Sequence, residues 1–150
     1  MPYKFLAHTA DLKIEAAGTD IEEAFIESAM ALKEAICGKI DIKQNVKIRK
    51  RIKVSGRDKE SLLYIFLEQF LYLLDAEDFL LNKVESIKIN KEDNEITANV
   101  IGDKASNHKF TNDVKAITYN EMFVGEEVEK DKKDSRNDKD KFICRFVVDV

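Results

Sequence analysis

Two acidic side chains near opposite ends of the sequence have the chemistry to bind a divalent cation together. Asp11 follows a short N-terminal strand pattern, whereas Asp149 stands beside Val150, whose α-carboxylate adds a second oxygen group there. Carboxylate oxygens are the ligands that Ca²⁺, Mg²⁺ and Mn²⁺ prefer. Terminal residues usually fray, but the apolar, β-forming stretch that leads to Asp149 would hold these groups in a sheet. The pattern alone permits a metal site without requiring one.

Lys115 and His8 carry further functional groups, and the pattern leaves their roles open. Lys115 alternates out of phase with its neighbours, as an outward, solvated strand lysine also would. His8 stands at a strand end, where a histidine is more often a hydrogen-bonded structural residue than a ligand or a base. Cys37 and Cys144 have apolar neighbours and no CxxC spacing. We therefore expect two buried free thiols and no zinc site.

A strongly basic strand is the third candidate site. Seven basic residues and no acidic residue lie in the range 43–57, and alternate positions place four of them on one face of a strand. That face could contact phosphates or an acidic partner, or it could protect an edge strand from pairing with other chains. The strand has no interleaved aromatic residue, the usual sign of a protein that stacks RNA bases. The four candidate docking residues are Lys47, Arg49, Arg51 and Lys53.

Composition and charge limit the classes of protein to consider. The 150 residues are 44% apolar and 36% charged, which is typical of one globular domain. A net charge of −4 argues against nucleic-acid binding by bulk attraction. The N-terminus has no apolar run typical of a signal peptide, and the longest apolar stretch, 62–74, is too short to span a bilayer. We therefore expect a soluble, cytoplasmic protein without membrane contact.

The elements that must position these residues show alternating helix and strand patterns. Helical spacing predicts a helix over 20–37, capped by Thr19 with Glu22, and a central buried helix over 59–75. The pattern predicts an α+β fold: a single domain, 1–150, with two main helices packed against a mostly antiparallel or mixed β-sheet. The charged stretch 126–141 is expected to be a flexible hairpin extension. One or two strands are expected over 3–16, and further strands over 45–54, 86–90, 95–102, 113–124 and 142–150.

Three short motifs, taken in order, resemble the signature of the archease family. They are HTAD at 8–11, KAITY at 115–119 and VVDV at 147–150, and the resemblance runs over essentially the whole chain. Archeases are small accessory proteins that activate the 3'-phosphate tRNA-splicing RNA ligase by promoting its GTP-dependent nucleotidylation and repeated turnover. The resemblance implies a chaperone-like, non-catalytic activator in tRNA splicing and RNA repair, with that ligase as partner and only indirect contact with RNA.

The resemblance also implies roles for individual residues. It places the family's divalent-metal site, for calcium, magnesium or manganese, on Asp11, Asp149 and Val150, and the family's functional lysine on Lys115. His8 then belongs beside the metal ligands, as a residue that orients them.

One position departs from the family pattern. Archeases commonly continue KAxTY with histidine, whereas this chain has Asn120. Asparagine keeps a hydrogen-bonding group but does not change charge near neutral pH, so the sequence does not support proton transfer at this position.

Two other functions stay open at this point. A metal-dependent hydrolase or nucleotidyl-transfer enzyme would use the carboxylates of Asp11 and Asp149 directly, and an RNA-binding module would use the basic stretch 43–57. The sequence contains no nucleophile elbow, glycine-rich phosphate loop or HExxH motif, which weighs against an ordinary nucleotide-using enzyme.

Overall fold

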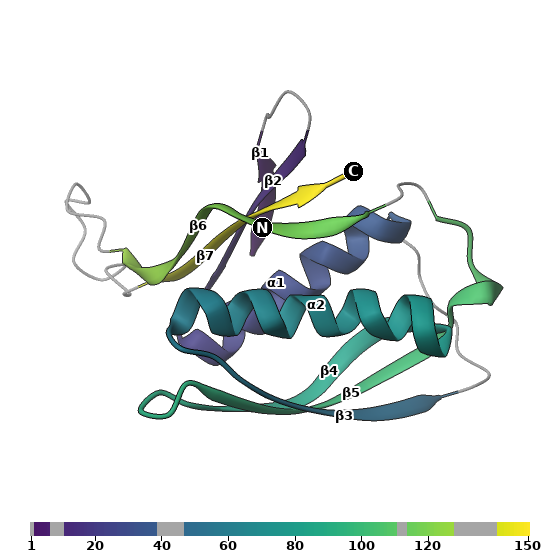
Figure 1. The fold of residues 1–150 in the computed structure, drawn as a ribbon, viewed down its shortest axis with the longest axis horizontal. Helices are drawn as coiled ribbons and strands as arrows, with labels where there is room; N and C mark the ends of the chain where they lie inside the picture. The colour runs from purple at the N-terminus through teal and green to yellow at the C-terminus, as the bar shows by residue number, and fades with distance from the viewer. Residues whose placement is uncertain (1, 7–10, 39–46, 111–113, 128–140) are drawn as a thin grey trace.

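Two antiparallel sheets enclose a layer of two helices (Figure 1). The computed structural model describes residues 2–6, 11–38, 47–110, 114–127 and 141–150, so His8 and most of the expected hairpin extension lie outside the described residues. The strand order is β1-β2-β7-β6 in the first sheet and β3-β5-β4 in the second. The strands are β1 (Tyr3–Leu6), β2 (Asp11–Gly18), β3 (Ile48–Ser55), β4 (Phe79–Asn90), β5 (Glu95–Lys104), β6 (Ala116–Glu127) and β7 (Lys141–Asp149).

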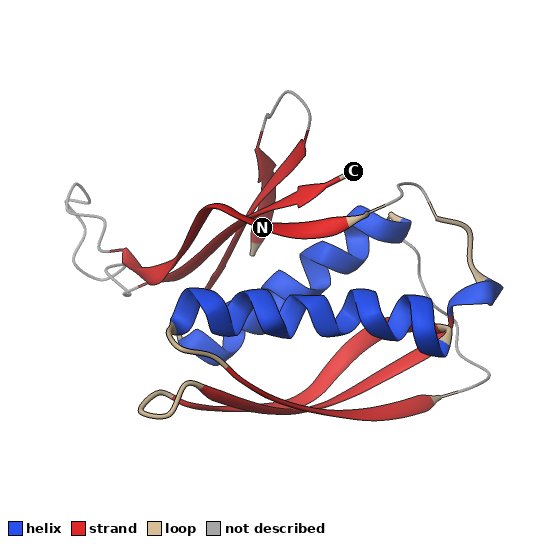
Figure 2. Cartoon of the chain, in the orientation of Figure 1, coloured by secondary structure: helices blue, strands red, loops and turns tan. Residues whose placement is uncertain are grey.

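The predicted α+β class is confirmed, and every described strand pairing is antiparallel. The pattern suggested one sheet covered on one side, whereas Figure 2 shows the helices between two sheets. Helix α1 (Ile21–Cys37) contacts β2 and β4, and helix α2 (Lys59–Glu77) contacts β6 and β4. Strand periodicity identifies the residues that face the core, but it does not show that β2 pairs with the distant β7.

The start of α1 is capped one residue later than the sequence suggested. Asp20, rather than Thr19, is the N-cap, and its Oδ1 accepts a hydrogen bond of 2.8 Å from the backbone N–H of Glu23. The Glu23 carboxylate in turn accepts a 2.8 Å hydrogen bond from the Thr19 hydroxyl, so a reciprocal capping arrangement forms with shifted partners. The helix ends at Gly38, whose φ of 74° suits glycine.

Helix α1, and not α2, is the more completely buried helix. The expectation that the later helix is central is therefore wrong, although Leu62, Phe66 and Leu67 of α2 are fully buried. Small residues let α1 lie close to both sheets, whereas α2 leaves Glu68 and Tyr72 exposed. The two helices meet through aromatic rings, with the centroids of Phe25 and Phe66 5.9 Å apart.

Strand β4 is longer than the predicted 86–90 because two irregularities hide its alternation. The register with β5 shifts between Leu81 and Lys83 and again between Val84 and Ser86. Each shift inserts a residue and moves the next side chain to the other face. The sequence pattern of the first half of β4 is therefore not the simple period of two that identifies a strand.

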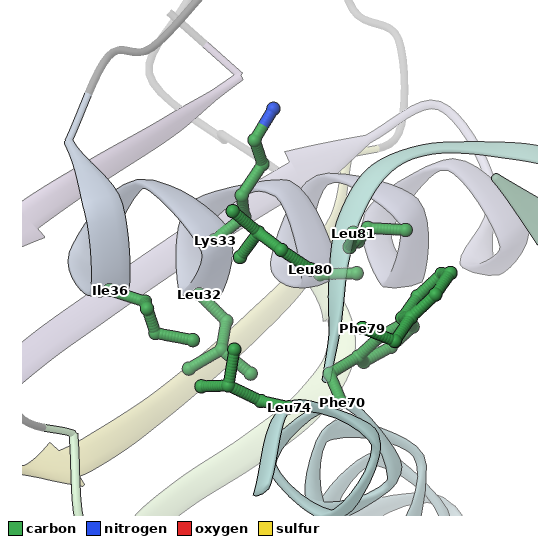
Figure 3. Close-up of a pocket in the computed structure, with 9 residues that line it drawn as sticks. Leu32, Lys33, Ile36, Phe70, Leu74, Phe79, Leu80 and Leu81 are labelled. Atoms are coloured by element: carbon green, nitrogen blue, oxygen red, sulfur yellow. The ribbon is translucent and has the colours of Figure 1, made fainter. Parts of the chain in front are cut away.

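A small cavity lies between α1, α2 and the start of β4 (Figure 3). It is about the size of one water molecule, so it is too small for a nucleotide. Figure 3 shows the ammonium group of Lys33 pointing away from the apolar side chains, so the cavity is a packing defect rather than a polar site. The labelled apolar residues that line it are Leu32, Ile36, Phe70, Leu74, Phe79, Leu80 and Leu81.

Gly102→Ala should strongly destabilise the protein. A Cβ at Gly102 would clash with the carbonyl oxygen of Leu80 and lie 2.5 Å from Cζ of buried Phe79. We expect the free energy of unfolding, measured in urea, to fall by about 1–3 kcal/mol. Gly125→Ala is the control, because its Cβ would meet the movable, partly exposed ring of Phe123. Equal losses in the two variants would contradict this account of the β4–β5 packing.

Candidate functional site

The three motif segments meet at one end of the four-stranded sheet. Strand β2 begins at Asp11, which lies opposite Asp149 at the end of β7. On the other side of β7, Asp149 lies opposite Ala116, the first residue of β6. The backbone N–H of Lys115 donates a 2.8 Å hydrogen bond to the carbonyl oxygen of Asp149. Residues more than 130 positions apart in the sequence therefore lie side by side, as Figure 1 shows for the ends of these strands.

The side chains of Asp11 and Asp149 share one face of the sheet. Directly opposite residues of an antiparallel pair have Cβ atoms about 4.5–5.5 Å apart. Both residues are half-buried, so their charges are less screened than on an open surface. Two carboxylates at this separation repel each other unless a cation or hydrogen-bond donors offset their charge.

The chemistry of this site fits a hard divalent cation. The two carboxylates supply oxygen ligands, and Val150 follows Asp149 directly. Thr118 lies two residues beyond Ala116 on β6, on the same face of the sheet as Asp149. Its hydroxyl oxygen is buried and has no hydrogen-bond partner among the described residues. A polar species bound beside the acids would satisfy it. Among the described residues, no cluster of three or more His, Cys, Asp or Glu side chains could hold a metal. Further ligands from this part of the chain would be main-chain oxygens, the carboxylate of Val150 or water.

Lys115 is exposed immediately before β6, as the sequence suggested. Asn120 is also exposed and lies in an irregular part of β6, where the register with β7 shifts between Thr118 and Phe123. Glu121 in this segment has a φ of 59°, which is uncommon for a residue other than glycine. Its carboxylate lies 3.5 Å from the ammonium group of Lys13 on β2. The bulge therefore connects β6 to β2 beside the acidic pair.

An ionic row, half-buried at Glu15 and Arg145, crosses the same face of the sheet next to the candidate site. The Glu15 carboxylate accepts a hydrogen bond of 2.7 Å from Arg145 and lies 3.0 Å from the ammonium group of Lys4. The guanidinium carbon of Arg145 lies 5.3 Å from the centre of the Phe123 ring, within the range of a cation–π contact. Burial opposes ionisation of Glu15, but hydrogen bonds from Arg145 and Lys4 outweigh it and lower the pKa of Glu15. These contacts fix the relative positions of all four strands.

Sequence reasoning missed this ionic row, although a signal was present. Odd-numbered residues of β2 and β7 lie on one face, so pairing Asp11 with Asp149 also pairs Glu15 with Arg145. The complementary charges of Glu15 and Arg145 become evident only once β2 is known to pair with β7.

The two cysteines are buried free thiols, as predicted. Burial raises the pKa of Cys144 to about 12, so it stays protonated at neutral pH. Cys37 lies at the end of α1, where its thiol donates a 3.2 Å hydrogen bond to the carbonyl oxygen of Lys33.

The basic strand is not part of the acidic site. Lys47, Arg49, Arg51 and Lys53 are exposed, and the last three lie on β3, at the edge of the other sheet. Lys50 points to the opposite face of β3 and pairs with Glu77 of α2 at 2.7 Å. The structure therefore separates the two candidate surfaces onto different sheets.

Comparison with known proteins agrees with this arrangement of motifs. The sequence model of the Archease protein family matches residues 3–150. The chain belongs to the archease family. Protein archease of Pyrococcus furiosus is 40% identical over 121 residues, covering 78% of this chain and 83% of the relative. Protein archease of Sulfolobus acidocaldarius is 33% identical, with 99% and 98% covered.

Archease relatives extend to animals and include a solved structure. Protein archease-like of Drosophila melanogaster is 34% identical, over 86% of this chain and 83% of the relative. The solution structure of protein 1598 of Methanobacterium thermoautotrophicum has a TM-score of 0.67 and 24% identity, and the match covers 99% of both chains. That likeness supports the fold of this archease. Within its described residues, no helix is long and apolar enough to cross a membrane.

Glu15→Gln should reduce stability in a pH-dependent way. Because the pKa of Glu15 is lowered in the folded protein, its ionised form stabilises the fold above its ordinary pKa of 4.5. We expect the variant to lose about 1–2 kcal/mol at pH 7, measured by urea unfolding. The loss should shrink as pH falls below about 4.5 and Glu15 becomes protonated.

Glu92→Gln is the matched control for that measurement, because Glu92 is exposed in the turn between β4 and β5. It should change stability by less than about 0.5 kcal/mol. A loss in Glu15→Gln that stays constant between pH 7 and pH 3 would show that the ionic row does not depend on the charge of Glu15.

Proposed function

We propose that this archease is a non-catalytic activator of the 3'-phosphate tRNA-splicing RNA ligase. It promotes the GTP-dependent nucleotidylation of the ligase and thereby its repeated turnover in tRNA splicing and RNA repair. The observation that carries the proposal is the meeting of Asp11, Asp149 and Lys115 at one end of the sheet. Because the proposed partner acts on tRNA, the proposal includes a cytoplasmic location.

Asp11, Asp149 and the carboxylate of Val150 would hold a divalent ion, with Ca²⁺, Mg²⁺ and Mn²⁺ as candidates. Such an ion offsets phosphate charge when it is bound close to a nucleotide. The register of β2 and β7 holds the two aspartates on one face, so the ligands are positioned before the ion arrives. His8 is proposed to orient these ligands from the preceding segment, which lies outside the described residues.

Lys115 would supply a positive charge at the same end of the sheet. Its backbone is anchored to Asp149, while its side chain is exposed. A lysine held in this way can reach a phosphate or a carboxylate on a docked partner. Asn120 has no charge to contribute, so the activation proposed here includes no proton transfer at that position.

An enzyme that uses Asp11 and Asp149 directly makes a different prediction. A metal-dependent hydrolase or nucleotidyl-transfer enzyme would turn over GTP or join RNA ends without a ligase. The purified protein, incubated alone with GTP and tRNA halves, should show no turnover. Turnover without ligase would overturn the activator proposal in favour of the enzyme.

Lys115→Ala should reduce ligase activation while the fold stays intact. Lys115 is exposed, so its removal should change the free energy of unfolding by less than about 0.5 kcal/mol. The rate at which labelled guanylate is transferred from GTP to the ligase should fall at least about tenfold, which corresponds to a rise of about 1.4 kcal/mol in the activation free energy. Lys109→Ala removes another exposed lysine and should activate normally. Normal activation by Lys115→Ala would leave Lys115 as an ordinary solvated lysine.

A divalent ion should raise the thermal stability of the protein. An ion that binds only the folded state at one hundred times its Kd adds about 2.7 kcal/mol. Asp11→Asn and Asp149→Asn should each abolish this gain and the activation of the ligase. Without metal, Asp149→Asn should be as stable as the parent or more so, because repulsion between the carboxylates is relieved. The thermal unfolding of chelator-treated protein, with and without added Ca²⁺, Mg²⁺ or Mn²⁺, measures these effects.

Two further variants complete that experiment: one is a control for the loss of an acid, and the other tests the carboxylate of Val150. Asp75→Asn changes an exposed acid on α2 and should keep the full gain from metal. A three-residue extension after Val150 moves the terminal carboxylate away and leaves both aspartates in place. If the extended protein still gains stability and activates the ligase, the carboxylate of Val150 is not a ligand.

A further inference from the structure

The three-stranded sheet has one face that the two helices do not cover. Figures 1 and 2 show α1 and α2 on one side of β3, β5 and β4, and no described helix on the other side. On that outer face, basic residues come from both edge strands. The central strand contributes polar Thr97 and Asn99, the buried Ile101 and, at one end, Glu95. The basic residues are Arg49, Arg51 and Lys53 on β3 and Lys83 and Lys88 on β4. We call this set of five the basic face.

The strand register places the five basic residues on the same side of the sheet. Residues directly opposite each other in antiparallel strands share a face. Asn99 of β5 lies opposite both Arg51 and Ser86, and its amide donates a 2.9 Å hydrogen bond to the Ser86 hydroxyl. The other face is the core side, because Ala98 and Val100 of β5 are fully buried there. The three cross-strand rows are Arg49–Ile101–Lys83, Arg51–Asn99–Ser86 and Lys53–Thr97–Lys88.

Most of the positive charge on the basic face is not neutralised within the described part of the chain. Arg49 lies 3.4 Å from Glu85 and Lys53 lies 3.8 Å from Glu95, and both basic side chains are 67% exposed. Pairs of this kind contribute little in water and exchange readily with other partners. Arg51, Lys83 and Lys88 have no acidic side chain within ion-pair distance among the described residues. This positive surface stands out in a chain whose net charge is −4.

Protection of a sheet edge does not account for this distribution of charge. Edge protection requires charged side chains on edge strands, but it does not require cations from both edge strands to gather on one face. Lys50 shows the contrast, because it points from β3 to the helix side and has Glu77 2.7 Å away. The inward lysine has a close acidic partner, whereas Arg51 and the two lysines of β4 do not.

We propose that the basic face binds the phosphate backbone of single-stranded RNA without reading its bases. Same-face residues repeat about every 6.5–7 Å along a strand, a regular spacing of cations that suits a regular chain of phosphates. Neutral donors on the same face, Thr97 and Asn99 on β5 and Ser86 on β4, are residue types that contact phosphate and sugar oxygens. The described face has no aromatic side chain on which bases would stack, so binding is independent of sequence and sensitive to salt.

This inference does not rest on the activator proposal, because RNA binding is measured without ligase. The probe is a fluorescein-labelled oligouridylate of twelve nucleotides, titrated by fluorescence anisotropy at salt concentrations from 50 to 200 mM. Arg51→Gln with Lys88→Gln removes two cations that have no described acidic partner. We expect RNA binding at 50 mM salt to weaken about tenfold or more. The slope of log K against log salt should decrease in magnitude by about 1.4, or 0.7 for each lost phosphate contact.

Lys104→Gln with Lys109→Gln is the matched control, because it makes the same change in net charge at exposed sites outside the basic face. It should bind RNA within about twofold of the parent. Circular dichroism checks that both double variants are folded. The proposal is overturned if the two double variants weaken RNA binding equally, or if neither weakens it. It is also overturned if Arg51→Gln with Lys88→Gln reduces ligase activation but leaves RNA binding unchanged. The face would then contact an acidic protein.

Discussion

The antiparallel pairing of β2 with β7 is the constraint on which the candidate site depends. These strands come from opposite ends of the chain, and their pairing places Asp11 directly opposite Asp149. It also places Glu15 opposite Arg145, which form a 2.7 Å hydrogen-bonded ion pair in the same face. The favourable ionic row helps to hold the two strands in register beside the two aspartates. One strand pairing therefore places both the ionic row and the two aspartates of the candidate site.

The two candidate surfaces lie on different sheets of the molecule. Asp11 and Asp149 lie at one end of the four-stranded sheet, and the basic face lies on the outside of the three-stranded sheet. The helices lie between the sheets, so the surfaces are separated by the hydrophobic core (Figure 1). An activator of an RNA ligase with this layout could contact the enzyme through one surface and its RNA through the other. The sequence expectation of only indirect RNA contact would then need revision.

Much of the site could be predicted from sequence because its residues lie in short motifs, but their geometry could not. Asp11, Lys115 and Asp149 were identified from three ordered motifs, and the structure brings those segments together. The ionic row was missed because complementary charges in β2 and β7 are visible only when the two strands are paired. The helices were predicted well by their spacing, whereas two bulges in β4 obscured half of that strand. Local patterns therefore identified the helices and strands, whereas long-range strand pairing determined which side chains lie next to one another.

The position of a bound metal tests the central claim most directly. Mn²⁺ scatters anomalously, so crystals grown with Mn²⁺ and measured near its absorption edge would show each bound ion. The account predicts an anomalous peak between the carboxylates of Asp11 and Asp149, at ligand distances near 2.2 Å, about those of an oxygen-bound divalent ion. A fully ordered sheet end with no peak there, or with manganese bound only elsewhere, would contradict it.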